Sequence, residues 1–295
     1  MGDISISDEL LIEELQKRLT DNKKALNDLR VLTTKMETLN LKLADSEAMK
    51  GNFLSNIRNE INNPLASIMG LSKQLARGKA DSLTAPGMAQ TILNEAFDLD
   101  FQLRNIFTAA ELEAGESTLS VSRVDIDSLI RNLLDSYNHR LAEKKLTVEL
   151  AGNISPVAGG PAYFNTDSEK LELILSNLLA NAIEFNKEGK KVKIAVIREE
   201  NRLVISLEDE GIGIPLEQRN NLFTRFRQLD TGARKVHRGH GLGLSITKAL
   251  AELLDGKIVC SSAACGGCIF TLSINEAGSG TLAETLSEEG NKFLF

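Results

Sequence analysis

An apolar stripe with heptad spacing runs through the first fifty residues, which contain no proline. With Ile12 in position a, seven of the ten a and d positions up to Leu43 are apolar, and charged residues fill much of the remainder. So long and narrow a stripe is typical of a helix that packs against a partner helix, and we expect a parallel dimeric coiled coil over 1–45. A single amphipathic helix that lies on its own domain is the alternative. Polar residues interrupt the seam and would fix its register: Asn22, Thr33 and Asn40.

The same periodicity continues to Leu75 and resumes after a turn-rich break at 77–86. The second helical pattern runs from Met88 to Leu112 and is followed by Gly115, a suitable C-cap residue. Two long helices joined by a short loop predict an antiparallel hairpin over 46–116. One hairpin alone would leave too much apolar surface in water, so we expect two copies to form a four-helix bundle in a homodimer.

From residue 117 onward, short strand-like segments alternate with amphipathic helices. This pattern predicts an α/β sandwich over 117–276, with a Gly- and Pro-containing loop at 152–161. The remainder, 277–295, is rich in Gly, Ser and Glu and is expected to be a frayed tail. The expected strands are 119–124, 146–150, 192–198, 203–208, 257–262 and 268–274, and the expected helices are 125–142, 167–186 and 242–254.

The balance of 34 Lys and Arg against 41 Asp and Glu gives a formal net charge of -7. Without a basic tract, such a chain has no electrostatic reason to bind nucleic acid, so we expect no nucleic-acid partner. No run of about 18 apolar residues occurs, so no membrane span is expected. Three cysteines fall too close together for a secreted disulfide framework, which favours a cytoplasmic location. We expect Cys260, Cys265 and Cys268 to be small buried hydrophobic residues, although the last two have the spacing of a redox dithiol or half a zinc site.

Four separate segments of the 117–276 region contain residues suited to bind a nucleotide. Asn177 and Asn181 are four residues apart on a predicted helix and therefore share one face. Asp209 follows a predicted strand and begins a Gly-rich turn, a later loop holds two phenylalanines, and glycines open the helix that begins near 242. The other residues of interest in these segments are Gly211, Gly213, Phe223, Phe226, Gly239, Gly241, Gly243 and Leu244.

Each residue type has a physical use at a nucleotide site. An Asn amide oxygen is a hard, neutral ligand for Mg²⁺ beside phosphate oxygens, where a carboxylate would add repulsion. A buried Asp can accept a hydrogen bond from the exocyclic amine of a base. Glycines let the backbone approach a flat base, and at a helix start they combine free N–H groups with the positive end of the helix dipole to bind phosphates. One such segment is weak evidence, but four in this order predict a nucleotide site.

In these segments the sequence resembles the sensor histidine kinases, which carry a GHKL-type (Bergerat) ATP-binding domain. The glycines in 266–270 also fit the last strand of that family, so the resemblance covers about residues 46–275. It implies an enzyme, a phosphotransferase that uses ATP and Mg²⁺. The matching segments are 177–183 (asparagine box), 209–215 (first glycine box), 222–226 (phenylalanine box) and 239–244 (second glycine box).

The resemblance also implies a role for individual residues. Asn181, with Asn177, would bind Mg²⁺, and Asp209 would accept a hydrogen bond from the adenine amino group. Gly211 and Gly213 would line the base, the second glycine box would contact the phosphates, and a lid would precede it. The rest of the implied nucleotide-binding set is Phe223, Phe226, Gly239, Gly241, Gly243 and Leu244, with the lid at 224–238.

One position of the asparagine box and the residue that follows the box bear on activity. The family usually has Lys at the position of Glu184, and a negative charge there could weaken nucleotide binding or be neutralised by neighbours such as Lys187. ATPases of the chaperone and mismatch-repair type share the nucleotide fold but need a catalytic Glu one turn before the metal-binding Asn. Asn177 stands at that place, so efficient direct hydrolysis is not expected.

The family's dimerisation helix carries the phosphoacceptor motif His-Glu-x-x-Thr/Asn-Pro-Leu, and residues 59–65 align with it without a gap. Asn59 stands in the histidine position, whereas Glu60 and Asn63 are intact. An imidazole nitrogen can attack the γ-phosphorus, with a carboxylate such as Glu60 to orient or deprotonate the ring, but the carboxamide lone pair is delocalised into its carbonyl. The chain's other candidate acceptors lie in the ATP domain, its lid and its phosphate loop and cannot substitute: His139, His237 and His240.

The sequence therefore predicts a cytoplasmic, homodimeric histidine kinase core that binds ATP and Mg²⁺ and acts with the receiver domain of a response regulator. Autophosphorylation would be blocked at Asn59, and the sequence leaves open whether this Asn is natural or introduced. Glu60 followed by Asn63 also matches the pattern by which family members dephosphorylate their regulator, a reaction that does not formally require the histidine. A regulatory pseudokinase that acts by nucleotide-dependent protein interaction is the alternative.

Overall fold

The computed structural model divides the chain into two units, Met1–Ser55 and Asn56–Phe295. In the first unit the described residues are helical, and their large apolar side chains are exposed, with Leu19 at 58% and Met36 at 64%. This exposure agrees with the expected need for a partner helix, but the coiled coil itself stays a prediction. The residues that the structure describes are 17–20, 23–24, 30–38, 40, 58–59, 61–78, 81, 83–153, 163–219, 222–224, 241–264 and 266–278.

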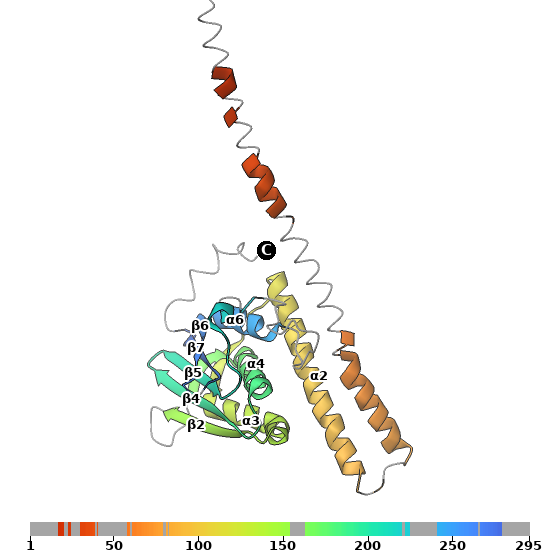
Figure 1. Ribbon diagram of the computed structural model, residues 1–295. Coiled ribbons are helices and arrows are strands. Elements are labelled where there is room, and N and C mark those ends of the chain that lie inside the picture. Colours follow the sequence, from red (N-terminus) through yellow and green to blue (C-terminus); the bar gives the residue numbers. More distant parts are fainter. Residues whose placement is uncertain are drawn as a thin grey trace, which may run out of the picture. The chain divides into compact units, whose positions relative to one another are not determined.

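A helical hairpin precedes the α/β part of the second unit (Figure 1). Its first helix includes 61–76, and its second, α2, spans Ala85–Ala114. Pro86 lies in the first turn of α2, where its missing N–H costs nothing, and Gly115 ends the helix with a left-handed φ of 68°. The antiparallel hairpin and its C-cap are thus confirmed, whereas dimerisation stays a prediction. Large apolar side chains are exposed on the hairpin of this single chain: Leu65, Met69, Leu83, Leu93 and Phe107.

A five-stranded sheet with helices packed against it forms the predicted α/β sandwich. The strand order is β2-β4-β5-β7-β6, with β2 parallel to β4 and the other neighbours antiparallel, while β1 and β3 form a separate antiparallel pair. The strands are β1 Val121–Asp125, β2 Thr147–Asn153, β3 Tyr163–Asp167, β4 Lys191–Glu199, β5 Arg202–Asp209, β6 Gly256–Ser262 and β7 Cys268–Asn275. The helices are α3 Ile126–Glu143, α4 Ser168–Phe185, α5 Leu216–Arg219 and α6 Gly243–Leu253.

The core lies between the sheet and the helices α4 and α6. In β5 and β7 every second residue is buried, which is the pattern of a strand with one face toward a core. α4 is buried along most of its length because it packs against α3, α6 and β5. Two polar residues of α4, Ser176 and Asn177, are buried as well, and they lie between the core and the hairpin.

Aspartates at the ends of β1 and β3 begin the helices α3 and α4. Asp125 accepts a hydrogen bond from the Ser128 N–H, and Asp167 accepts one from the Lys170 N–H at 3.0 Å. Burial opposes ionisation of Asp167, but hydrogen bonds from the Ser120 and Lys170 backbones and the Lys170 ammonium outweigh it, so its pKa is lowered. Both helices therefore start where the sequence predicts.

The sequence-based prediction missed two short elements. β3 follows the expected loop and pairs with β1, and its buried Phe164 and Thr166 alternate with exposed residues. That alternation covers only the five residues of β3, too few for the pattern to stand out. α5 is a single turn within a region expected to be loop. None of the helices among the described residues has both the length and the apolar character that crossing a membrane requires.

Candidate nucleotide site

Asp209 lies at the end of β5 with only 5% of its surface exposed. Its Oδ1 accepts hydrogen bonds from the backbone N–H of Gly211 at 2.9 Å and of Cys268 at 3.3 Å. Burial raises the pKa of this carboxyl, while the two N–H donors act in the opposite direction. A buried acceptor held in place by two backbone donors is well suited to recognise an amine of a bound base.

Two glycines allow the backbone to close around this carboxylate. A Cβ on Gly211 would collide with the Phe185 carbonyl oxygen and lie 2.8 Å from Asp209 Oδ1. A Cβ on Gly267, whose φ is +86°, would collide with the Asp209 carbonyl oxygen. Gly211 was expected here from the sequence. Gly267 was expected only as part of the last strand, and its place against Asp209 is an addition to the site.

The two asparagines of α4 lie in different surroundings. Asn177 is 3% exposed, and its Nδ2 donates to Asn105 Oδ1 at 2.8 Å and to the Leu173 carbonyl at 3.1 Å. Its Oδ1 faces the start of α6, since a Cβ on Gly243 would lie 2.6 Å from that oxygen. Asn181, one turn further along α4, is half-buried. The structure therefore brings an amide oxygen to the start of the helix that the second glycine box opens.

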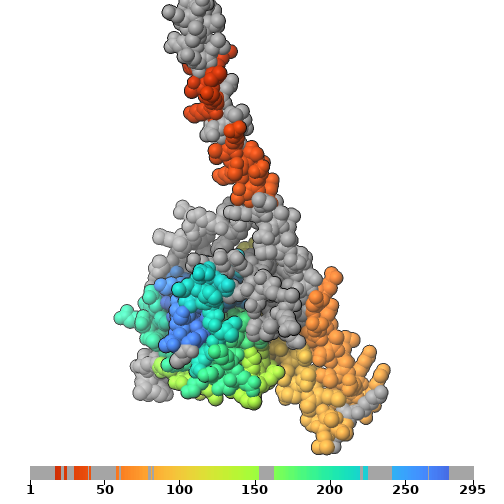
Figure 2. Space-filling model, in the orientation of Figure 1, coloured from red at the N-terminus to blue at the C-terminus, as the bar shows by residue number. Residues whose placement is uncertain are grey.

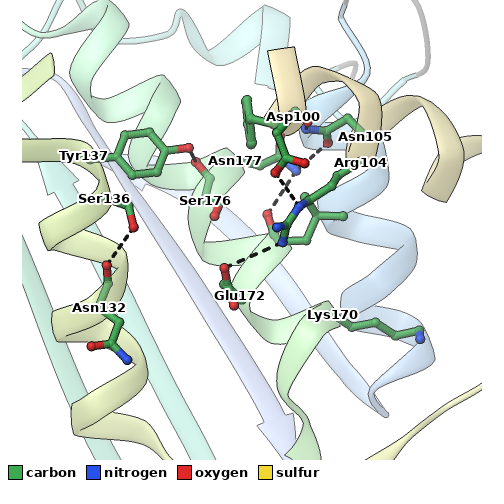
Figure 3. A network of polar contacts seen from close by, with 12 residues as sticks. Asp100, Arg104, Asn105, Asn132, Ser136, Tyr137, Lys170, Glu172, Ser176 and Asn177 are labelled. Carbon is green, nitrogen blue, oxygen red and sulfur yellow. Dashed lines mark hydrogen bonds and ion pairs between the residues drawn. The ribbon is translucent and has the colours of Figure 1, made fainter. Parts of the chain in front are cut away.

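Helix α2 of the hairpin contacts the α/β domain beside Asn177 (Figures 1 and 3). Arg104 of α2 lies 3.9 Å from Glu172 of α4 and pairs with Asp100 of its own helix at 2.8 Å. In the same region Tyr137 of α3 donates a hydrogen bond to the Ser176 carbonyl at 3.4 Å. The space-filling view also shows α2 against this domain (Figure 2).

Sequence reasoning missed this contact between the hairpin and the domain. The face of α2 that makes it carries Phe97, Phe101 and Asn105, which recur every four residues and so share one side of a helix. The rings of Phe97 and Phe101 meet Tyr137 edge-on at centroid distances of 5.2 and 6.4 Å. This second face could have been recognised in the sequence. It was overlooked because the apolar residues of the helix were assigned to dimerisation.

Glu184, at the position where the family usually has Lys, lies beside Arg140 of α3. Its Oε2 is 3.9 Å from Arg140 Nη2, and Arg140 Nη1 is 3.8 Å from Asp98 of α2. The Lys144 ammonium donates to the carbonyls of Ile183 and Glu184 at the end of α4. Cations near Glu184 were expected from the sequence, but neither Arg140 nor Lys144 was named.

The remaining predicted site residues are only partly described. Phe223, Gly241 and Leu244 are half-buried, the last of them in α6, and Gly213 has a left-handed φ of 70° next to the backbone of Gly267. Asn59 and Asn63 are exposed on the hairpin. Several predicted residues lie outside the described part of the chain: Glu60, Phe226, Gly239, His237, His240, Cys265 and nearly all of the lid.

The cysteine prediction is confirmed for Cys268, which is 4% exposed beneath Asp209. Its hydrogen bond with Cys260 and its burial both raise the pKa of the Cys268 thiol. Cys260, on the neighbouring strand, is half-buried. Among the described residues, no group of three or more His, Cys, Asp and Glu side chains is arranged to hold a metal ion.

Two family models match the chain. Residues 166–278 match the family described as histidine kinase-, DNA gyrase B- and HSP90-like ATPase. Residues 49–115 match the His Kinase A (phospho-acceptor) domain. The first match contains α4, Asp209 and Gly267, and the second contains the hairpin. The α/β domain and the hairpin therefore each match a separate family model.

Individual relatives agree with these matches. The circadian input-output histidine kinase CikA of Synechococcus elongatus is 33% identical over 269 residues, which cover 89% of this chain and 35% of CikA. The sensor histidine kinase TmoS of Ectopseudomonas mendocina is 27% identical over 260 residues, covering 88% of this chain and 26% of TmoS. The homologues of this chain are histidine kinases, a phosphotransferase family. This histidine kinase-like chain spans about a third or less of the length of the curated relatives that it matches.

A solved structure has a similar fold. Full-length ShkA in complex with AMPPNP matches with a TM-score of 0.54 and 23% identity, covering 77% of this chain and 46% of ShkA. The family of the 166–278 segment binds ATP. The buried Asp209 acceptor and the close backbone at Gly211 and Gly267 fit a flat base that carries an amine, as adenine does.

Proposed function

We propose that this chain is the core of a histidine kinase that binds ATP with Mg²⁺ but cannot phosphorylate itself. The observation that carries the proposal is Asn59, which takes the place of the histidine when residues 59–65 are aligned with the acceptor motif, within the 49–115 segment that matches the phospho-acceptor family. A carboxamide has no free nitrogen lone pair to attack a phosphorus atom, so the γ-phosphate finds no acceptor at this position.

The residues around Asp209 and Asn177 would hold the nucleotide. Asp209 would accept a hydrogen bond from the adenine amine, and Gly211 and Gly213 would line the base. The second glycine box would bind the phosphates through its backbone N–H groups, with Phe223, Phe226 and Leu244 around them. The amide oxygens of Asn177 and Asn181 would hold Mg²⁺, which neutralises charge on the phosphate oxygens. The Asn177 oxygen supports this assignment because it is a neutral oxygen that faces the start of α6.

The proposed partners are a second copy of the chain and the receiver domain of a response regulator. The exposed apolar side chains of the hairpin support a homodimer with a four-helix bundle, and the domains would be 1–45, 46–116 and 117–276, with a tail at 277–295. Glu60 and Asn63 would orient a water molecule on a phospho-aspartate and so dephosphorylate the regulator. We place this reaction in the cytoplasm, where ATP is available.

Phosphorylation of an Asn59→His variant tests the proposal. The unchanged chain, incubated with labelled ATP and Mg²⁺, is expected to acquire no acid-labile phosphate, whereas the variant acquires it. Asn62→His is a matched control, since Asn62 is exposed on the same hairpin helix but outside the acceptor position. The proposal fails if Asn59→His remains unlabelled while it still binds nucleotide, or if Asn62→His is labelled equally.

A regulatory pseudokinase is a second candidate, and the hydrogen bond between Asn105 and Asn177 favours it. Because this bond joins the hairpin to the proposed nucleotide helix, nucleotide binding could change the hairpin surface that a partner meets. Asp209→Ala tests whether the biological output depends on nucleotide at all. A kinase or a nucleotide-dependent pseudokinase loses its biological output with this change, while a purely protein-binding pseudokinase keeps it.

A further inference from the structure

The two ends of the Asn177 amide face different elements. Its Nδ2 faces two acceptors, the Leu173 carbonyl at 3.1 Å and Asn105 Oδ1 at 2.8 Å (Figure 3). A carbonyl can only accept, so the end of the amide that meets it must be the NH₂ group. The opposite end, Oδ1, then points toward Gly243 at the start of α6.

Asn105 is itself a fixed acceptor. It is the buried residue of α2, only 7% exposed, and its own Nδ2 donates to the Phe101 carbonyl at 3.0 Å. That bond turns Asn105 Oδ1 toward Asn177. A reversed Asn177 amide would set two oxygens against each other in a buried place and leave its own nitrogen without this acceptor.

The packing around this pair keeps α2 in place. Phe97 and Phe101 lie edge-on to the buried ring of Tyr137, and Arg104 lies 3.9 Å from Glu172 of α4. These contacts surround the Asn105–Asn177 bond with apolar surface and a partly exposed ion pair. The Asn105–Asn177 hydrogen bond is therefore buried within the contact between α2 and the domain, where a hydrogen bond is stronger and more costly to lose than in water.

We infer that Asn105, on the hairpin, is a positioning residue for the metal site of the ATP domain. Through Asn177 it aims an amide oxygen at the place where the phosphate-bound Mg²⁺ would lie. This inference rests on the proposed function, in which Asn177 is a ligand of Mg²⁺. Partners behind a metal ligand hold it in its productive orientation, and their removal weakens metal binding even though they never touch the metal.

The arrangement links the hairpin to the affinity for Mg²⁺-nucleotide. When α2 is packed against the domain, the Asn177 amide oxygen faces the start of α6. When α2 moves away, only the Leu173 carbonyl restrains the amide. A signal that rotates or shifts α2 would thus change metal-dependent nucleotide binding without any direct contact between hairpin and nucleotide.

Binding of ADP to the full chain, measured by calorimetry with and without Mg²⁺, tests this inference. Asn105→Ala is expected to reduce the gain in affinity that Mg²⁺ provides by about tenfold, the lower end of the effect of losing a partner behind a metal ligand. Its Mg²⁺-free affinity for ADP is expected to be unchanged, because Asp209 and the base site are intact. Asn105→Asp keeps an acceptor oxygen for Asn177 but sets its second oxygen against the Phe101 carbonyl, so it is expected to restore the Mg²⁺ effect only in part.

Two controls make the outcome decisive. Gln90→Ala alters an exposed side chain on the same helix and is expected to leave both affinities unchanged. Asn177→Ala tests the proposed function itself, since it must lose the Mg²⁺ effect if Asn177 is a ligand. If Asn177→Ala loses that effect and Asn105→Ala does not, the inference is wrong. If Asn177→Ala keeps it, the proposed metal role is wrong, and equal losses by Asn105→Ala with and without Mg²⁺ would mark Asn105 as merely structural.

Discussion

Arg140 on α3 connects a carboxylate of the hairpin to a carboxylate of the proposed nucleotide helix. Its guanidinium lies 3.9 Å from Glu184 and 3.8 Å from Asp98, and only 22% of the Arg140 side chain is exposed. Glu184 follows Asn181 by nearly one turn, so its charge lies close to the place proposed for the phosphates. Arg140 therefore compensates a negative charge at a position where the family usually has a positive one.

Arg140→Gln is expected to weaken nucleotide binding. The change removes the Arg140 cation from beside Glu184 and so makes the surroundings of the phosphates more negative. Because the three side chains are partly exposed, we expect a loss of about 0.5–1 kcal/mol, a few-fold change in affinity that shrinks at high salt. Titration with ADP at low and high ionic strength measures it.

The matched control for this prediction is Lys145→Gln. Lys145 pairs with Glu188 at 2.6 Å, but both side chains are largely exposed, at 74% and 64%. The expectation is an unchanged affinity. A loss as large as that of Arg140→Gln would mean that overall charge, and not the position of Arg140, decides the effect.

Gly211→Ala is expected to damage the base site. A methyl group there would collide with the Phe185 carbonyl and crowd the Asp209 carboxylate. The backbone must shift, which we expect to cost about 1–3 kcal/mol in the free energy of unfolding and more than tenfold in nucleotide affinity. Urea denaturation and nucleotide titration check both. Gly87→Ala, on α2 where a Cβ would meet nothing, should leave both values within error or slightly raise stability.

Local patterns in the sequence predicted most of the fold. The hairpin follows from apolar periodicity and Gly115, and the start of α4 follows from Asp167, because each signal lies within a few consecutive residues. Asp209 and Gly211 could be placed in the site because a strand end and a tight turn bring them together without help from distant segments. The strand β3 was missed because its alternation of buried and exposed residues covers only five positions.

The contacts that join distant elements could not be predicted. Asn105 and Asn177 lie far apart in the sequence, and their bond forms where Phe97 and Phe101 of α2 pack against Tyr137 of α3. Arg140 meets Glu184 only because α3 and α4 pack side by side. Helix periodicity shows which residues share a face, but it does not say which neighbour that face will meet.

The stability contributed by Asp167 is expected to depend on pH. Its pKa is lower in the folded chain than in the unfolded one, so the ionised form stabilises the fold above the unfolded value of about 4. This contribution is lost as the pH falls through the folded pKa. Relative to Asp167→Asn, which still caps α4, the unchanged chain should be more stable at pH 7, and this advantage should shrink as the pH falls below about 4. Denaturation curves across this range measure the difference, and a constant difference would contradict the expectation.

Asp209→Asn is expected to change which purine the site prefers. The N–H groups of Gly211 and Cys268 both need an acceptor, so the Asn oxygen should stay with them and its NH₂ group should replace the second carboxylate oxygen. A donor in that place repels the adenine amine but can bond to the 6-oxo group of inosine. We expect ATP affinity to fall at least about tenfold, or 1.4 kcal/mol, while ITP affinity holds or rises. Glu208→Gln, a neutralised neighbour on the same strand, is the control in parallel titrations. Equal losses for ATP and ITP would show that Asp209 supports the turn and does not select the base.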